Sequence, residues 1–503
     1  MKRKKELIVI LSSLLVIVLS VSVAYFTTKI LGTGKEISVE SADLKVIFTS
    51  GSGTINGTNI EPGWTSGENT FTVKNESNGT YKYNIIIKDL VNTFVTEGFL
   101  QYKITSTDGG YTMSDFVDVP KSSTATDTIL AKNISIEKGA THTYKIIINY
   151  NNSEDVDQSA DMDKMLSGKI FITEATNPTL ASKLLEDNPT IGTRNDFSTP
   201  FTTNTANTLY KATENGTDVY YFAGQDTEST PINNWVKFGK NSSNQDLYWR
   251  IIRTNSDGSI RLLYHGTSTT ATDAYIGESE FNTTRNSPKY VGYMYGDTDD
   301  TLEEARTNTN NSTIKTAIDD WYASNMTSYT KYLSTTAVYC NDRELASGST
   351  YTTTSSSNFY FKSNERLEEN MRPSYDCANI KDAFSGNNIE AKLTYPIALM
   401  TADEISYAGG VIAEDSPMWY YTNSSLESST GTTEWWSLSP DYWNSDAHSW
   451  HVLGSDIPGG LNGHYVNNWF GVRPAVSLKA CVQWKSGDGS ANSPYEIVEN
   501  GGC

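Results

Sequence analysis

Short runs of alternating or β-branched residues, separated by Gly, Asn and Ser, constrain the first third of this chain. Successive side chains of a strand point to opposite faces, so such runs predict strands with one buried face. Six runs follow one another: Ser38–Phe48, Thr70–Lys74, Tyr81–Lys88, Tyr102–Thr105, Thr141–Tyr150 and Gly168–Thr173. Their spacing predicts an antiparallel, all-β sandwich of Ig-like or jelly-roll type over residues 37–174.

An apolar run near the N-terminus predicts export. The basic residues Lys2 to Lys5 precede an uncharged stretch from Leu7 to Phe26, and a helix of about 20 residues spans the hydrocarbon core of a bilayer. Basic residues stay on the cytoplasmic side. Residues 1–26 therefore predict either a transmembrane anchor or a signal peptide, and Ser22-Val23-Ala24 offers a cleavage site after Ala24. We expect the remainder on the extracellular side of the membrane, at the cell surface, or secreted.

Composition narrows the class of partner. The 503 residues carry a formal net charge of −20, which argues against nucleic acid, because phosphate binding needs clustered Lys and Arg. An aromatic content of 11% predicts packed cores rather than disorder. We expect partners among host or bacterial surface glycans or proteins.

The N-terminal third also resembles a known group of exported proteins. Ala24-Tyr25-Phe26 after the apolar run, the early strand Asp43–Val46, the Pro62-Gly63 turn and Phe71–Asn75 resemble the fibre and matrix proteins of the TasA and camelysin type. The resemblance implies self-assembly through the sandwich. The protease role attributed to camelysin-like proteins does not carry over, because only His142 falls in this region and no His-Glu-x-x-His occurs in the chain.

An acidic loop precedes the last predicted strand of the sandwich. Asp155, Asp157, Asp161 and Asp163 supply oxygen ligands of the kind that Ca²⁺ prefers, but the loop lacks the Gly and the terminal Glu of an EF-hand. We therefore interpret it as a solvated loop and expect no cofactor.

Composition shifts to Thr, Asn and Pro over residues 175–208, which predicts a linker with a short helical island. Beyond it, residues 209–503 predict an α+β domain. Leu247–Arg253 and Ser259–His265 flank Asp257-Gly258 and predict a hairpin. Apolar residues at helical spacing predict a helix over Ser312–Ser324, and a capping box at Thr401–Glu404 predicts another that ends at Gly409.

Several motifs of this domain resemble the DUF6273 family of Firmicutes and Mollicutes surface proteins. They are Tyr395–Glu404, Tyr407–Gly410, Trp435–Pro440 and Gly471–Val476. Their order is also similar to the C-type-lectin-like fold of formylglycine-generating enzymes and of retroelement variable proteins. This second resemblance implies a fold and no activity. The copper-binding cysteine pair of formylglycine-generating enzymes has no matching motif here.

All four cysteines lie in the C-terminal half of the chain. An exported chain permits disulfides, and four cysteines allow three pairings. Pairing neighbours in sequence joins Cys340 to Cys377 and Cys481 to Cys503, and free thiols are the alternative. No Cys-x-x-Cys occurs, which argues against a zinc ribbon.

The stretch from Asp441 to Trp469 combines aromatic rings with Asn and His. Rings supply contact area and amides supply adaptable hydrogen bonds, a combination typical of binding loops and of sugar recognition. We expect Trp435, Trp436 and Trp450 in the core, and Arg473 to close the fold. The candidate ligand-binding residues are Tyr442, Trp443, Asn444, His451, Asn462, His464, Tyr465, Asn467 and Trp469.

These features favour a non-enzymatic surface protein, in which a sandwich module presents a lectin-like, adhesin-type domain. Two alternatives stay open: a structural fibre subunit of the TasA type, and a surface hydrolase that uses acidic residues such as Asp403 and Glu404. We predict no catalytic residue and no metal site, because His448 and His451 lie three apart in a predicted strand and face opposite sides.

Overall fold

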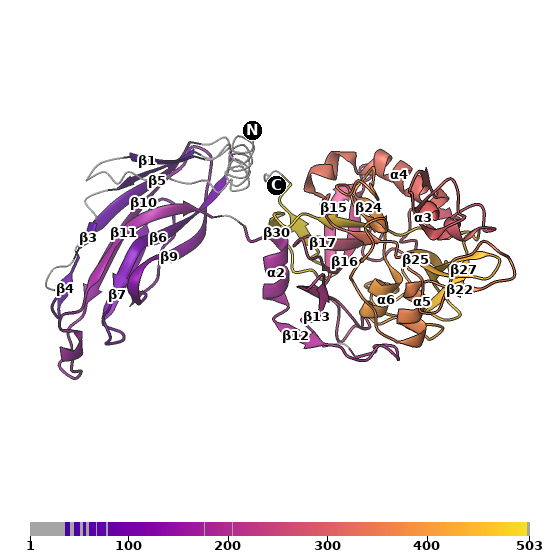
Figure 1. The fold of residues 1–503 in the computed structure, drawn as a ribbon. Helices are drawn as coiled ribbons and strands as arrows, with labels where there is room; N and C mark the ends of the chain where they lie inside the picture. Colours follow the sequence, from indigo (N-terminus) through magenta and orange to yellow (C-terminus); the bar gives the residue numbers. More distant parts are fainter. Residues whose placement is uncertain are drawn as a thin grey trace, which may run out of the picture. The chain divides into compact units, whose positions relative to one another are not determined.

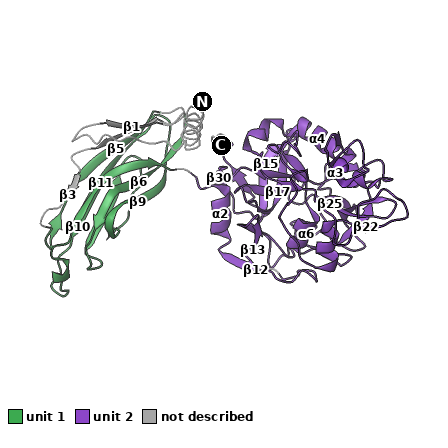
Figure 2. Ribbon diagram, viewed as in Figure 1, with its two compact units in different colours: residues 1–176 green, residues 177–503 purple. Residues whose placement is uncertain are grey.

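The computed structural model describes two compact units, residues 1–176 and 177–503 (Figure 2). It describes the backbone of residues 36–40, 45–50 and 54–56, and all atoms of 60–66, 68–76, 79–175, 177–203 and 205–499. The predicted anchor or signal peptide, residues 1–26, lies outside these ranges. Within them, no helix has the length and apolar character needed to cross a bilayer.

Unit 1 is built from strands in two sheets (Figure 1). The first sheet has the order β1-β2-β5-β10-β7-β8, and β4 pairs with β10. Its strands are β1 (Glu36–Glu40), β2 (Lys45–Ser50), β4 (Trp64–Thr65), β5 (Asn69–Asn75), β7 (Leu100–Ser106), β8 (Val117–Asp118) and β10 (Thr141–Tyr150). The second sheet has the order β3-β11-β6-β9. Its strands are β3 (Thr54–Asn56), β6 (Tyr81–Asn92), β9 (Ser122–Ile136) and β11 (Leu166–Glu174).

The two sheets share one hydrophobic core, which is consistent with a β-sandwich. Buried side chains reach it from both sheets, among them Val73, Ile104 and Ile146 from the first and Ile85 and Ile172 from the second. Buried and exposed positions alternate along β10, which is why the sequence pattern predicted this strand.

The predicted runs from Thr70 onward are strands in the structure. The first run, Ser38–Phe48, instead spans β1 and β2, which pair antiparallel. The pattern missed β9, which lies at the edge of its sheet. Its sequence is rich in Ser and Thr and many of its side chains are exposed, so it lacks the apolar alternation that marks a half-buried strand.

The acidic loop carries a short 3₁₀ helix, η1 (Ser159–Asp161). The Asp161 carboxylate accepts hydrogen bonds from the amides of Val95 and Thr96 and from the Tyr150 hydroxyl. These bonds join the acidic loop to the segment at Val95 and Thr96 and to β10, so the role of Asp161 in this fold is structural.

Unit 2 contains two larger sheets and two strand pairs. The first sheet comprises β12 (Thr190–Thr193), β13 (Thr208–Glu214), β14 (Thr217–Tyr221), β15 (Trp235–Lys240), β16 (Asp246–Thr254), β17 (Ile260–Tyr264), β24 (Ile397–Leu399), β29 (Pro474–Leu478), β30 (Trp484–Ser486) and β31 (Tyr495–Ile497). The second comprises β18 (Glu278–Ser279), β22 (Phe359–Tyr360), β25 (Trp435–Trp443), β26 (Ala447–Val452), β27 (Leu461–Tyr465) and β28 (Phe470–Gly471). The pairs are β19 (Met294–Tyr295) with β20 (Asn310–Asn311) and β21 (Tyr339–Cys340) with β23 (Ala383–Phe384).

The predicted hairpin and both predicted helices of unit 2 are confirmed. β16 and β17 pair antiparallel, and Gly258 in their turn has φ +79°. Ser312 caps α4 (Thr313–Asn325). Thr401 and Glu404 form the capping box of α6 (Ala402–Ala408), which ends at Gly409 with φ +120°. The remaining helical segments are α2 (Leu180–Asp187), α3 (Leu302–Ala305), α5 (Lys362–Asn364), the 3₁₀ turns η2 (Pro288–Val291) and η3 (Thr327–Tyr332), and the π turn η4 (Glu365–Glu369).

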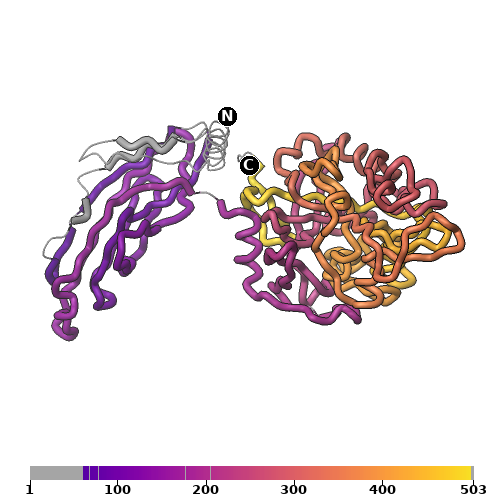
Figure 3. Tube along the Cα trace, in the orientation of Figure 1, coloured from indigo at the N-terminus to yellow at the C-terminus, as the bar shows by residue number. Residues whose placement is uncertain are grey.

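The segment expected as a linker, residues 175–208, largely belongs to unit 2. Leu180 and Leu184 of α2 are buried in its core, and β12 pairs in parallel with β13. The amide of Leu180 donates to the carbonyl of Val482, and in Figure 3 the yellow segment that holds β30 runs beside the magenta helix α2. The prediction was wrong because a short helix with only a few apolar residues reads as a connector until its partner strand is known.

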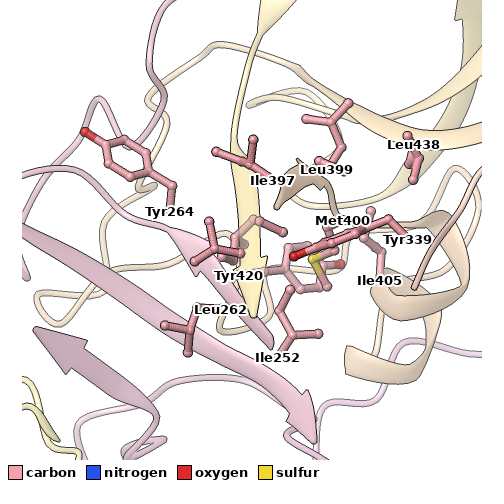
Figure 4. Close-up of a cluster of buried hydrophobic side chains, with 14 of the residues drawn as sticks. Ile252, Leu262, Tyr264, Tyr339, Ile397, Leu399, Met400, Ile405, Tyr420 and Leu438 are labelled. Atoms are coloured by element: carbon pink, nitrogen blue, oxygen red, sulfur yellow. The ribbon is translucent and has the colours of Figure 1, made fainter. Parts of the chain in front are cut away.

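The core of unit 2 joins both sheets and α6. Figure 4 shows Ile252 and Leu262 of the first sheet near Ile397, Met400 and Tyr420. Trp435, Trp436 and Trp450 are fully buried, as predicted, and so is Arg473. The predicted Cys340–Cys377 disulfide is confirmed, with a sequence separation of 37 residues. The predicted partner of Cys481, Cys503, lies outside the described residues.

Candidate ligand-binding site

The predicted binding stretch folds into a three-stranded ribbon, β25–β26–β27, joined at its edge by β22. In Figure 1, β22, β25 and β27 lie at one side of unit 2. In the antiparallel register, Tyr360 lies opposite Tyr442, and His448 lies opposite Tyr465. Since side chains alternate along β26, His448 and His451 emerge on opposite faces.

One face carries four rings in sequence, which we call the aromatic ladder: Tyr360, Tyr442, His448 and Tyr465. Ring centroids are 5.9 Å apart for Tyr360 and Tyr442, 4.0 Å for Tyr442 and His448, and 4.5 Å for His448 and Tyr465. The Arg285 guanidinium lies 4.3 Å from the Tyr465 ring centroid. Contacts of this kind hold each ring in place. The ladder is therefore a preorganised surface.

Hydrogen bonding sets the protonation of His448, the third ring of the aromatic ladder. His448 Nδ1 lies 3.0 Å from the carbonyl oxygen of Asp446, so Nδ1 carries the proton and Nε2 is an acceptor. Burial lowers the pKa of His448 to about 4. His448 is neutral at physiological pH, and within the described part of the chain neither its Nε2 nor the three tyrosine hydroxyls of the ladder have a hydrogen-bond partner. The tyrosine hydroxyls are available to a ligand or to water, whereas His448 is only 3% exposed.

The opposite face holds a second group around His451. Its Nε2 lies 2.9 Å from Oε2 of Glu434, and its Nδ1 lies 2.7 Å from the Asn462 carbonyl. The hydrogen bond from His451 lowers the pKa of Glu434. Phe470 stacks on His451 at 4.7 Å, and the His464 ring lies 5.5 Å from His451. His451 is fully buried, so this group supports the ribbon from behind.

The structure divides the predicted site residues. Tyr442 and Tyr465 lie in the ladder, Trp469 is 65% exposed, and Asn462 is exposed. His464 is half-buried against His451. Asn444 and Asn467 are half-buried, and the Oδ1 atom of each is buried and has no hydrogen-bond partner among the described residues. Buried polar atoms are normally satisfied, so these two turns are places where a ligand or water completes the bonding.

Two of the predicted ligand-binding residues, Trp443 and His451, are buried in the structure. Trp443 was a candidate ligand-binding residue, yet it is 1% exposed and belongs to the core. It lies at the end of β25, where Phe359 is its cross-strand partner. A Trp in a loop-like composition of Gly, Ser and Asp gives no signal of which face it takes, because β25 carries register shifts against β26.

Three members of the ladder site were not among the predicted ligand-binding residues: His448, which lies within the Asp441–Trp469 stretch, and Tyr360 and Arg285. Tyr360 and Arg285 lie far from the Asp441–Trp469 stretch in the chain. Tyr360 is 44% exposed and reaches the site because β22 pairs with β25. Arg285 reaches it because the Ala447 amide donates to the Arg285 carbonyl. Strands of two residues are too short to show a periodic pattern.

Asp441 is a buried carboxyl behind the ladder. Its Oδ1 accepts a hydrogen bond of 2.7 Å from Asn364 Nδ2. Burial raises the pKa of Asp441 to about 8, so the side chain is largely protonated at neutral pH. Gly463 passes directly over its other oxygen, where any Cβ would overlap Oδ2.

The acidic pair of the hydrolase alternative lies in a network of buried ion pairs. Glu404 Oε1 is 2.9 Å from Arg253 Nε and 2.6 Å from Arg261 Nη1, and Glu404 Oε2 accepts from the Thr401 amide. Although burial favours the neutral form, the two guanidinium groups hold the pKa of Glu404 below its usual value. Asp403 pairs with Arg366 through both oxygens. Both carboxylates are committed to the fold.

A separate hollow of about 520 Å³ opens beside β15 and β31. Most of its charged side chains are paired with one another: Lys237 and Lys485 with Glu496, and Lys240 with Asp246. Glu499 also lines the hollow. Over the described residues, no group of three or more His, Cys, Asp or Glu is placed to hold a metal ion.

Comparison with known proteins adds no relative. No protein-family model matches the chain, and no curated protein matches it. The fold and the ribbon therefore define the class: a two-unit, β-rich protein with a preorganised aromatic and polar surface on its second unit.

Proposed function

We propose that the chain is an exported bacterial surface protein whose second unit binds ligands, of the glycan or protein type, at the aromatic ladder. The single observation that carries this proposal is the ladder itself. Four rings in consecutive contact leave tyrosine hydroxyls and a histidine acceptor unpaired within the described part of the chain. Rigid rings combined with free polar atoms offer contact area at a low entropic cost, and they suit the alternating apolar and hydroxyl surfaces of sugars.

The proposal extends to the fold family and to the location. An N-terminal anchor or cleaved signal peptide, a sandwich module and a DUF6273-like head of C-type-lectin-like type together describe an adhesin-type protein. The Cys340–Cys377 disulfide supports an oxidising location, since structural disulfides persist mainly outside the cytosol.

A glycan array probed with the full chain tests the proposal. We expect binding that is weakened by Tyr465→Ala and by Trp469→Ala. Tyr111→Ala is the matched control, because Tyr111 is an exposed ring of unit 1. Trp443→Ala is not a useful probe, because it deletes a core side chain. Loss of binding in the Tyr111 variant alone, or binding that neither Tyr465→Ala nor Trp469→Ala weakens, would contradict the proposal.

A second candidate function is assembly through unit 1. The long strand β9 is the edge of its sheet among the described strands, and its Ile129 is 55% exposed. Exposed edge strands are templates for pairing with another chain. We expect Ile129→Lys to suppress fibres or oligomers seen by light scattering, with Val156→Lys, in the acidic loop, as an exposed control. A wild type that stays monomeric at high concentration would contradict this role.

A further inference from the structure

Arg285 differs from the other arginines of unit 2 in how it is held. Most of them are buried, and they pair with carboxylates or backbone carbonyls. Arg285 has a side chain that is 40% exposed and an ion pair of 2.9 Å from its Nε to Asp446 Oδ1. The Tyr465 ring lies under its guanidinium. The partly exposed guanidinium of Arg285 is thus held by Asp446 at one edge and by the Tyr465 ring at one face.

The ion pair uses only one edge of the guanidinium. Nε faces Asp446, and within the described ranges Nη1 and Nη2 have no acceptor. The guanidinium is planar, and two parallel N–H groups match the two oxygens of a carboxylate or a sulfate. An exposed pair such as Arg285 with Asp446 is weak by itself. The stack on Tyr465 is what reduces the entropic cost of presenting the free N–H groups.

Neither His448 nor Tyr442 carries a charge at neutral pH. His448 is neutral because burial lowers its pKa to about 4, and burial raises the pKa of Tyr442 to about 12. Arg285 therefore supplies the positive charge at the ladder. The chain as a whole has a net charge of −20, so attraction of an anion to this place requires a local, positioned cation rather than a general field.

We infer that the ladder binds anionic carbohydrate, with Arg285 holding a carboxylate or sulfate of the sugar. This inference rests on the proposed function and names its ligand class. A sugar is favoured over an acidic peptide, because the ladder offers ring edges, hydroxyls and a histidine acceptor beside the guanidinium. A sugar ring presents hydroxyls and an anionic group on one rigid frame that matches this arrangement.

The test compares ligands that differ only in charge. Oligogalacturonate and its methyl ester, sialyllactose and lactose, and a heparin oligosaccharide and its desulfated form are titrated against the full chain. We expect at least one anionic member to bind about tenfold or more tighter than its neutral partner, with affinity falling as salt rises. A sulfated but not a carboxylated pair responding identifies sulfate as the group.

Variants locate the contact. Arg285→Gln is expected to reduce anionic binding at least about tenfold, and Arg285→Lys to restore part of it, because a lysine keeps the charge without the fork. Arg372→Gln is the matched control, since Arg372 is also exposed and forms no ion pair among the described residues. Equal binding of charged and neutral partners, an unaffected Arg285→Gln variant, or binding of polyglutamate alone would overturn the inference.

The outcomes separate the inference from the function on which it rests. Binding of neutral glycans that depends on Tyr465 but not on Arg285 would overturn the inference and leave the proposed function standing. Absence of binding to any glycan, charged or neutral, and to protein ligands would overturn both.

Discussion

At the scale of single residues, burial decides what each polar group of the ribbon can do. Asp441 and Glu404 are both buried carboxyls, but Glu404 faces two guanidinium groups and Asp441 faces one amide. The pKa is accordingly lowered for Glu404 and raised for Asp441. The sequence shows both as Asp or Glu near an aromatic segment, and only the three-dimensional partners separate them.

The neutral state of His448 predicts a loss of stability in acid. Its native pKa of about 4 lies below the usual value of 6.5, so the unfolded state takes up the proton first as pH falls. The free energy of unfolding of unit 2 should decrease between pH 6.5 and 4, by roughly 2–3 kcal/mol from this group, and level off below pH 4. Denaturant titrations monitored by tryptophan fluorescence measure it. In His448→Phe this component should vanish, and an unchanged pH dependence would contradict the assignment.

Asp441 predicts the opposite trend. Because its native pKa of about 8 is raised above 3.8, the unfolded state releases its proton first, and stability is lost as pH rises from about 4 to 8. Asp441→Asn keeps the acceptor for Asn364 and removes the titration. We expect this variant to be more stable than wild type at pH 8, by up to about 5 kcal/mol, and to match it near pH 4. Equal stabilities at both pH values would contradict the prediction.

At the scale of elements, the ribbon depends on one close approach. Gly463 in β27 lies over Asp441 and Tyr442, and a Cβ at this position would overlap Asp441 Oδ2. Gly463→Ala should destabilise unit 2 by about 1–3 kcal/mol and weaken ligand binding, because β27 carries Tyr465. A double-mutant cycle with Asp441→Ala checks the cause. The second substitution should remove much of the cost, whereas additive effects would show that the overlap is not responsible.

Elements were predictable where a local pattern carries the information. α4 and α6 have caps and helical spacing, and β10 has strict alternation. β9 and β22 were missed, and α2, although predicted as a helical island, was assigned to a linker. An exposed edge strand, a strand of two residues and the packing of a short apolar island all depend on partners distant in sequence. The same reason applies to the candidate site. Tyr442 and Tyr465 were predicted from the composition of their segment, whereas only the fold shows that Tyr360 and Arg285 lie beside them.

At the scale of the whole molecule, the two units have separate hydrophobic cores, and every cysteine of the chain lies in the second. We expect two transitions in scanning calorimetry of the full chain. Closing a loop of 37 residues stabilises unit 2 by about 4 kcal/mol in the chain-entropy model. The Cys340→Ser/Cys377→Ser variant should lower the melting temperature of one transition by several degrees and leave the other in place. A single transition that moves as a whole would contradict the separation of the units.

The central claim is that ligands bind at the ladder of unit 2. Hydrogen–deuterium exchange of the full chain, with and without the glycan that binds best on the array, tests it most directly. We predict slower exchange in residues 442–448 and 461–469 and around Arg285 and Tyr360, with unit 1 unchanged. Protection confined to unit 1, or to the hollow lined by Lys237 and Lys240, would contradict it.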